Sequence, residues 1–355
     1  MLVRKLLVVG LTLLVCLLIL EFGLRIIGRT PTNMSDGIYE QDGDSFRLKK
    51  NATKVIKYPA FTYTVYTNEF GFRAASAGRS GLGHKPFYAV LGASEVFGNG
   101  VQYEDTFIGI FATEAQRKGM EVMNLATGGH NFLDQEALLR SFIADSGHKP
   151  STVLFCLNAL HIPAFDQKNK HIIVKSGHAI DRDGWRITYL RLMAGNISSA
   201  FCFFRDGIRK IQEKWLEQSL GSKSSQFLDV YSKANRIRRP ERINAFEDYL
   251  ASFEAYCRQN GMTLVYVYLP LSDSFRLTEL VRLIGENPDD YDASFYETLM
   301  HSYCQKAGVK LVDLGPALQE QHDEGQDLRF KLDPHFNVFG NRVIGEYLIK
   351  ALLED

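Results

Sequence analysis

The chain carries no excess of charge of either sign. Its 41 lysine and arginine residues are balanced by 41 aspartate and glutamate residues, so the formal net charge at pH 7 is zero. Binding to nucleic acid or to an anionic surface through overall charge requires a clear basic excess. The sequence therefore gives no reason to expect nucleic acid as a partner. Hydrophobic residues make up 45% of the chain and charged residues 23%, as in an ordinary globular protein.

Cysteine is scarce and scattered. The five cysteines are Cys16, Cys156, Cys202, Cys257 and Cys304, and none forms the close pairs that ligate zinc. We expect each to behave as a small buried apolar residue. A disulfide that includes Cys202 or Cys257 stays open, because sequence cannot pair them. No metal-ligating cluster and no phosphate-binding loop stands out, so we expect neither a metal nor a cofactor.

Only one long apolar run is present, at the amino terminus. Arg4 and Lys5 precede a run over residues 6–20. A helix of that length reaches about 22 Å, short of a hydrocarbon core of about 30 Å, but residues 21–27 extend it. We interpret residues 1–27 as a single-pass membrane anchor that acts through residues 6–27. A cleaved signal sequence is the alternative, and the lack of a small-x-small site after the run favours the anchor.

The orientation of that anchor follows from its short amino-terminal tail. Such a tail is expected to stay in the cytoplasm, which puts the main domain on the extracytoplasmic side, periplasmic or external. Residues 28–66 are polar and rich in turn residues, and we interpret them as a tether followed by the first strands. Within them, apolar and polar residues alternate over residues 61–66, a pattern that suits an edge strand.

A buried strand followed by a serine organises the rest of the chain. Residues 88–91 form a short apolar run bounded by turn residues, typical of a core strand in an α/β sheet. Gly92 permits a sharp turn. Ser94 then lies just beyond the carboxyl end of the strand, where open α/β sheets bind ligands. A serine hydroxyl is a poor nucleophile at neutral pH unless a base lies nearby.

A candidate base occurs near the carboxyl terminus. Asp333 and His335 flank Pro334, and an amphipathic helix follows. Histidine accepts protons near neutral pH, while a carboxylate fixes its tautomer and stabilises the imidazolium. Taken alone, the segment is more typical of a turn with a helix-capping residue. The catalytic interpretation therefore depends on the other motifs of the chain.

Strand and helix patterns alternate through most of the remaining sequence, which predicts a parallel sheet flanked by helices. The predicted helices cover residues 107–119, 134–143, 243–260, 291–306 and 342–353, and the predicted strands cover residues 121–125, 153–157, 263–269 and 309–314.

Residues 160–240 interrupt this alternation. Residues 172–174 and 185–187 suggest the two strands of a small hairpin, and residues 197–220 form a helical pattern. The basic run over residues 236–242 is more typical of a solvated face than of an anion site. We interpret the whole segment as an insertion that forms a cap over the site.

Four segments resemble the blocks of the SGNH hydrolases, also called the GDSL-like family. They are residues 92–94 (GAS), 124–129 (NLATGG), 154–158 (LFCLN) and 333–340 (DPHFNVFG). A further segment, residues 67–73 (TNEFGFR), resembles a lead-in seen before the first block in membrane-anchored members. Their order and spacing fit the family over residues 65–355, apart from the middle of the chain. Two positions depart from the family pattern. Ala93 stands where the first block usually has aspartate, and Ala159 stands where the third block often has aspartate.

The resemblance implies a fold and a site. The fold is a three-layer α/β/α domain over residues 67–355 with a mostly parallel, flavodoxin-like central sheet. The implied catalytic residues are Ser94, His335 and Asp333. The implied oxyanion hole consists of the backbone amides of Ser94 and Gly129 and the side chain of Asn158. Each such donor typically changes the rate by about a hundred- to a thousandfold.

Two further histidines, His130 and His161, lie near predicted strand ends. We expect them to be supporting or exposed polar residues, because neither has an acidic neighbour at a useful spacing.

The function that the resemblance implies is a membrane-anchored extracytoplasmic serine hydrolase that cleaves acetyl-type esters of a carbohydrate or lipid. An O-acyltransferase that modifies an envelope or exported glycan is one alternative. A non-catalytic tethered binding module is the other, and only Ala93 and Ala159 favour it.

Overall fold

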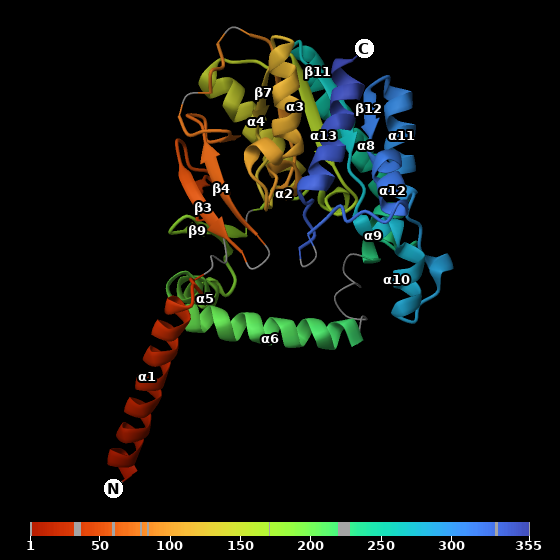
Figure 1. Ribbon diagram of the computed structural model, residues 1–355. Helices are drawn as coiled ribbons and strands as arrows, with labels where there is room; N and C mark the ends of the chain where they lie inside the picture. Colours follow the sequence, from red (N-terminus) through yellow and green to blue (C-terminus); the bar gives the residue numbers. More distant parts are fainter. Residues whose placement is uncertain are drawn as a thin grey trace.

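The structure is a computed structural model that describes residues 2–31, 37–58, 61–78, 80–83, 85–169, 171–218, 228–330 and 333–354. Its main body has three layers, with helices on both faces of a central sheet (Figure 1). The eight strands described in this sheet run in the order β12-β11-β8-β6-β7-β5-β4-β3.

Five of these strands are parallel: β6 (Phe87–Leu91), β7 (Glu121–Asn124), β8 (Thr152–Leu157), β11 (Thr263–Tyr268) and β12 (Lys310–Asp313). Taken in chain order, they are arranged 2-1-3-4-5, which is the flavodoxin-like order. The predicted fold class is confirmed. Each predicted strand of this half is present within a residue or two of its expected bounds.

The central strand β6 shows why the sheet needs two helical layers. All five of its residues are buried, because helices cover both faces of a parallel sheet. Successive side chains point to opposite faces, so Tyr88 and Val90 enter one core while Ala89 and Leu91 enter the other.

Helices α3 (Phe107–Arg117), α12 (Gly315–Asp323) and α13 (Val338–Leu353) supply the first core, and α4 (Phe132–Ser146), α8 (Pro240–Gln259) and α11 (Phe295–Ala307) supply the second. Helix α12 was not expected from the sequence. The short helices α2 (Ser94–Phe97), α9 (Ser272–Phe275) and α10 (Leu277–Leu283) lie in the connections.

Three antiparallel strands extend the sheet beyond β7: β3 (Thr53–Lys57), β4 (Thr62–Thr67) and β5 (Arg73–Ala74). Tyr63 and Val65 of β4 are buried, as the alternating pattern predicted. The prediction that this segment is an edge strand was wrong, because β3 lies outside it. Alternation of apolar and polar residues indicates that one face of a strand is buried. It does not indicate whether the strand pairs with one neighbouring strand or with two.

Two hairpins pack beside the sheet. The first is β1 (Tyr39–Asp42) with β2 (Ser45–Leu48), and the second is β9 (Ile172–Lys175) with β10 (His178–Asp181). The predicted second strand at residues 185–187 was wrong. Ser176 and Gly177 have φ values of 50° and 84° and form a two-residue turn, so the chain reverses earlier than expected.

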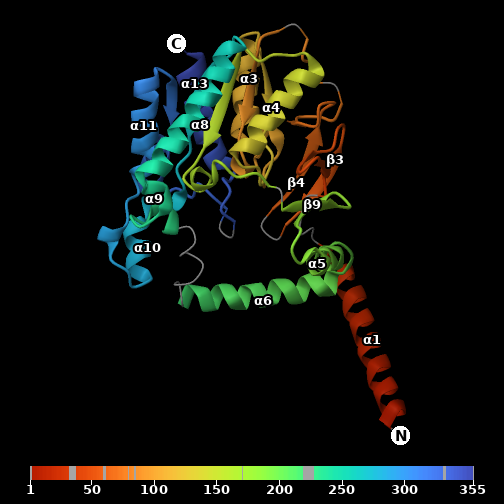
Figure 2. The ribbon, with the colours of Figure 1, turned by 180° about the vertical axis from the view of Figure 1, so that it is seen from behind.

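The residues expected in that strand begin α5 (Trp185–Ile197), and α6 (Ser199–Gln218) follows. Residues 219 and 220 of the predicted helix lie outside the described residues. Figures 1 and 2 show α6 running across one end of the α/β body, with α5 close to its start.

Helix α1 (Leu2–Ile26) projects away from the body in both views. Its residues Arg4–Ile26 are long and apolar enough to cross a membrane, and most of that stretch is exposed, with Leu24 buried near its end. All five cysteines are free, so no disulfide includes Cys202 or Cys257. Four are buried as expected. Cys16 is exposed because it lies on α1.

Candidate functional site

The carboxyl ends of the parallel strands meet at one edge of the sheet. Ser94 is the first residue of α2, directly after β6, and Asn158 directly follows β8. The loop that carries Gly129 follows β7. Figure 1 shows α2 at the end of the body that faces α6. The fold thus places the predicted serine and the predicted oxyanion donors on loops at a single sheet edge.

Gly92 precedes Ser94 for a reason other than the expected one. We predicted a sharp backbone turn, but Gly92 is not among the residues with positive φ. A Cβ atom at position 92 would instead lie 2.2 Å from Cγ2 of Val96. Glycine is therefore required because α2 packs directly on its own lead-in turn.

Asp333 and His335 form the predicted pair. Nδ1 of His335 lies 2.5 Å from Oδ1 of Asp333, and the backbone N–H of His335 donates to the same oxygen at 3.0 Å. Both side chains are mostly buried, with exposed fractions of 17% for His335 and 24% for Asp333. An ionised carboxylate can only accept, so His335 carries its proton on Nδ1 and leaves Nε2 as the acceptor.

The acceptor nitrogen of His335 faces the loop that follows the serine helix. Its Nε2 lies 3.3 Å from Nδ2 of Asn99, and Oδ1 of Asn99 accepts a hydrogen bond from the Tyr63 hydroxyl at 3.0 Å. Oγ of Ser94 bonds Oε2 of Glu95 at 3.4 Å. Among the described contacts, no hydrogen bond joins Ser94 to His335. Sequence reasoning missed Asn99, because no local pattern connects it to His335.

Glu95 is a carboxylate that interacts with several basic side chains at the carboxyl edge of the sheet. Burial by itself raises the pKa of its carboxyl group, but electrostatic interactions with His161, Arg329 and His335 lower it, and the net shift is downward. Glu95 is therefore ionised at neutral pH. Its negative charge lies among the groups that would carry positive charge in a catalytic cycle.

Both additional histidines have acidic neighbours, contrary to our expectation. Burial lowers the pKa of His161 and the charge of Glu95 opposes that effect. Burial also lowers the pKa of His130, against the charge of Asp134 four residues along the chain. His130 is buried and bonds the carbonyl oxygen of Phe46 at 2.7 Å. The pairing of His161 with Glu95 joins segments that are distant in sequence. The pairing of His130 with Asp134 spans only four residues and was visible in the sequence.

The loop after β7 lies against the serine. A Cβ atom at Gly128 would lie 3.8 Å from Cβ of Ser94 and 3.3 Å from the Tyr39 hydroxyl. Gly129 has a φ of 85°, which L side chains rarely adopt. These positions agree with a role in binding an oxyanion. The role of the Gly129 amide itself stays a prediction.

Asn158 also ties down its own loop. Its Oδ1 accepts from the backbone amides of Leu160 at 3.0 Å and His161 at 3.2 Å. The side chain therefore closes the turn after β8, and only its Nδ2 is left to donate. The assignment of Nδ2 to an oxyanion stays a prediction.

Arg73 holds the loop that follows the serine helix α2, which we call the serine loop. The sequence motif did not reveal this role. The side chain is 1% exposed, and its guanidinium donates to the carbonyl oxygens of Phe97, Gly98 and Val101, the last two at 2.6 Å. These carbonyls flank Asn99. Arg73 thus fixes the loop that contacts His335.

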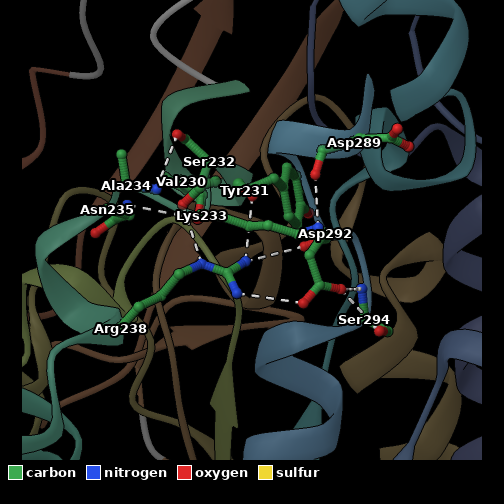
Figure 3. A network of polar contacts seen from close by, with 10 residues as sticks. All are labelled: Val230, Tyr231, Ser232, Lys233, Ala234, Asn235, Arg238, Asp289, Asp292 and Ser294. Atoms are coloured by element: carbon green, nitrogen blue, oxygen red, sulfur yellow. Dashed lines mark hydrogen bonds and ion pairs between the residues drawn. The ribbon is translucent and has the colours of Figure 1, made fainter. Parts of the chain in front are cut away.

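Within the basic run of residues 236–242, some arginines hold neighbouring segments together and others are exposed to solvent. Figure 3 shows Arg238 in a network in which Nη1 pairs with Oδ2 of Asp292 at 3.2 Å and Nε donates to the Ser232 carbonyl at 3.0 Å. Arg236 and Arg239 are exposed, as expected for a solvated face.

A cavity of about 780 Å³ beside this run is lined by arginines and carboxylates in equal number: Arg236, Arg239, Arg242, Asp166, Asp229 and Glu241. The balance of charge in this cavity gives no support to an anion site.

One cluster among the described residues has the composition of a metal site. Donor atoms of Glu297, His301 and Asp313 all lie within 4.8 Å of one another. Nε2 of His301 lies 2.7 Å from Oδ2 of Asp313. Burial, and then the charge of Asp313, raises the pKa of Glu297. The two carboxyl groups therefore repel each other when both are ionised.

Comparison with known proteins agrees with the sequence motifs. Residues 227–355 match the family model described as "ALGX: SGNH hydrolase-like domain, acetyltransferase AlgX". This part of the chain is therefore similar to an SGNH hydrolase-like domain. The match includes Asp333 and His335, and Ser94 lies outside the matched residues. No curated protein matches the chain by sequence.

Several solved structures are similar to this chain. A protein described as lipolytic and of the G-D-S-L family, from Desulfitobacterium hafniense DCB-2, is 13% identical, with 75% of this chain and 99% of that chain covered and a TM-score of 0.39. A catalytic mutant of an acetylxylan esterase from Geobacillus stearothermophilus is 12% identical, with 75% and 93% covered and a TM-score of 0.40. The fold assignment rests on the strand order of this chain itself.

Proposed function

We propose that the chain is a membrane-anchored enzyme that cleaves acyl esters, with Ser94 as nucleophile, His335 as general base and Asp333 as the residue that orients His335. One observation carries the proposal. Asp333 holds Nδ1 of His335 at 2.5 Å while the opposite ring nitrogen faces the loop that follows Ser94. A carboxylate that orients the histidine in this way is one part of what a serine nucleophile requires from its base.

The reaction begins when Oγ of Ser94 attacks the acyl carbonyl and its proton passes to Nε2 of His335. For this step Nε2 exchanges its contact with Asn99 for one with Ser94, and catalytic hydrogen bonds commonly tighten only when substrate binds. The imidazolium then gives the proton to the departing alcohol. The acyl group is left as an ester on Ser94.

Two sets of residues stabilise the charges that develop in this step, one set for the negative charge and one for the positive charge. Negative charge on the acyl oxygen is met by the amides of Ser94 and Gly129 and by Nδ2 of Asn158. Positive charge on His335 is met by Asp333 and by ionised Glu95, whose carboxylate interacts with His335. Glu95 thus adds a second negative charge near the base.

The fate of the acyl group separates two candidate activities. Attack by water gives an esterase that acts on acetyl-type esters of a carbohydrate or lipid. Attack by a carbohydrate hydroxyl gives an O-acyltransferase, and the family match of residues 227–355 favours this second candidate because the family's description names an acetyltransferase. Both activities pass through the same ester on Ser94.

The proposed location is the extracytoplasmic face of a membrane. Its support is the apolar helix Arg4–Ile26 with the basic residues Arg4 and Lys5 at its first turn, since basic residues beside a spanning helix tend to remain in the cytoplasm.

The test uses the purified full-length chain with an acetyl-labelled aryl ester, with and without an unacetylated glycan. Acetate release that depends on Ser94 and is unchanged by glycan supports the esterase. Label that moves to the glycan at the expense of free acetate supports the acyltransferase. If the wild type neither releases acetate nor labels the glycan, the chain is a non-catalytic binding module and the proposal is wrong. If Ser94→Ala matches an active wild type, the assignment of Ser94 as nucleophile is wrong.

A further inference from the structure

Helix α1 is joined to the α5–α6 segment by specific side-chain contacts. The Glu21 carboxylate accepts hydrogen bonds from the Ser198 hydroxyl at 3.0 Å and from the backbone amides of Ser199 at 3.1 Å and Ala200 at 2.9 Å. The first amides of a helix lack partners within the helix, so Glu21 caps the start of α6. A charge that interrupts the apolar run thus has a structural function.

A second contact fixes the end of α5. Nη2 of Arg25 donates to the carbonyl oxygen of Ile197 at 2.7 Å, and Nε of Arg25 pairs with Oε1 of Glu21 at 2.7 Å. One ion pair on the last turns of α1 therefore holds the end of one helix and the start of the next. The direction in which α1 leaves the body is fixed relative to α5 and α6.

The two helices lie on the side of the body from which α1 projects. In both views α6 runs across the direction of α1 and along the end of the α/β body (Figures 1 and 2). If α1 spans a membrane, α5 and α6 lie between that membrane and the body.

Both helices expose large apolar side chains. Six such residues are between 47% and 68% exposed: Ile187, Leu190, Ile197, Phe203, Phe204 and Ile208. The exposed residues of α6 recur at positions 203, 204, 207 and 208, which is one face of a helix. Exposed Arg186 and Arg191 accompany the apolar side chains of α5.

We propose that α5 and α6 lie in the surface of the membrane that α1 crosses, with these apolar side chains among the lipid headgroups and upper acyl chains. The inference rests on the proposed membrane anchor. Amphipathic helices that carry aromatic and aliphatic residues beside arginine bind membranes in this manner. Glu21 and Arg25 join the end of α5 and the start of α6 to the last turns of the spanning helix, so lipid is the occupant that fits these exposed apolar side chains.

The experiment places an environment-sensitive nitrobenzoxadiazole label on single exposed cysteines of the full-length chain in vesicles of phosphatidylcholine and phosphatidylglycerol. Native Cys16 reports on α1, and the other four cysteines are buried. In a Cys16→Ser background, Phe204→Cys and Ile208→Cys report on α6. Gln116→Cys is the matched control, because it is exposed at the far end of α3.

Nitroxide-labelled lipids are expected to quench the label at positions 204 and 208 to at least half the extent seen at Cys16, and to leave position 116 unchanged. Quenching at Cys16 without quenching at 204 and 208 overturns the inference and leaves the anchor standing. No quenching at Cys16 overturns the anchor and the inference together. Shielding of 204 and 208 from aqueous iodide without lipid quenching shows that protein covers the face, which also overturns the inference.

Discussion

The side-chain amide of Asn99 lies 3.3 Å from Nε2 of His335, across 236 positions of sequence. The Tyr63 hydroxyl occupies Oδ1 of Asn99 at 3.0 Å, so the amide nitrogen of Asn99 is the atom turned toward the histidine. Nε2 must then accept, which keeps the ring proton on Nδ1 beside Asp333. Asn99 thereby holds the imidazole in the tautomer that a general base needs.

We predict that Asn99→Ala lowers kcat for ester cleavage about fivefold. The lost hydrogen bond contributes about 1 kcal/mol to positioning, and 1.4 kcal/mol corresponds to a factor of ten. KM should change little, because Asn99 is proposed to act through His335 and not on the substrate. Nitrogen NMR of His335 should show a loss of the single tautomer.

Gln102→Ala is the matched control for Asn99→Ala. Gln102 follows on the same loop and accepts from the backbone amide of Thr64 at 3.2 Å, and no described contact joins it to His335. Equal losses of kcat in the two variants would mean that the loop, and not the amide of Asn99, supports the base.

Arg73→Lys should destabilise the protein by about 3 kcal/mol. A lysine cannot reach all three carbonyls that the guanidinium bonds, and each hydrogen bond to a charged group contributes about 1.5–3 kcal/mol. Thermal unfolding followed by circular dichroism measures the change. Arg117→Lys is the control, because Arg117 is 72% exposed and pairs only with Glu114 among its described contacts, an interaction of about 0–1 kcal/mol. Similar melting temperatures for the two variants would contradict the role of Arg73.

Glu297→Gln should raise the melting temperature at pH 7 and have less effect at pH 4. Burial, and then the charge of Asp313, raises the pKa of Glu297 above 4.5. The stability that the protonated group contributes is present below pH 4.5 and is lost as the pH rises through the folded-state pKa. Glutamine keeps the neutral form at every pH. Exposed Glu279, whose pKa is lowered by Arg276, provides the control substitution.

A lower melting temperature of Glu297→Gln at pH 7 would contradict this account. A drop in the melting temperature of the wild type on addition of a chelator would show that the cluster with His301 and Asp313 holds a metal.

Much of the fold could be predicted because the central parallel strands are short, largely apolar and separated by segments with helical periodicity. Residues 88–91 and 153–157 are examples, since both of their faces are covered. The hairpin was predicted less well. Trp185 and Ile187 have side chains common in strands, which is why residues 185–187 were predicted as the second strand. The turn at Ser176 and Gly177 instead makes the second strand begin at residue 178.

The candidate site also has one part that could be predicted from the sequence and another part that could not. Asp333 and His335 are two residues apart, so one loop brings them together and the sequence suffices. The contacts of Asn99 with His335 and of Glu95 with His161 join segments that are distant in sequence, and no local pattern encodes them. Arg73 was part of a recognised segment, yet its complete burial under the serine loop follows only from the packing of β5 against β7.

Covalent labelling by a fluorophosphonate probe tests the catalytic assignment most directly. The wild type should be labelled, and mass spectrometry should place the label on Ser94. Ser94→Ala should retain its melting temperature and lose labelling. His335→Ala should label far more slowly, and Asp333→Asn should lose more in rate than in stability, since its geometry survives while the tautomer is lost. Undiminished labelling of Ser94→Ala would contradict the account.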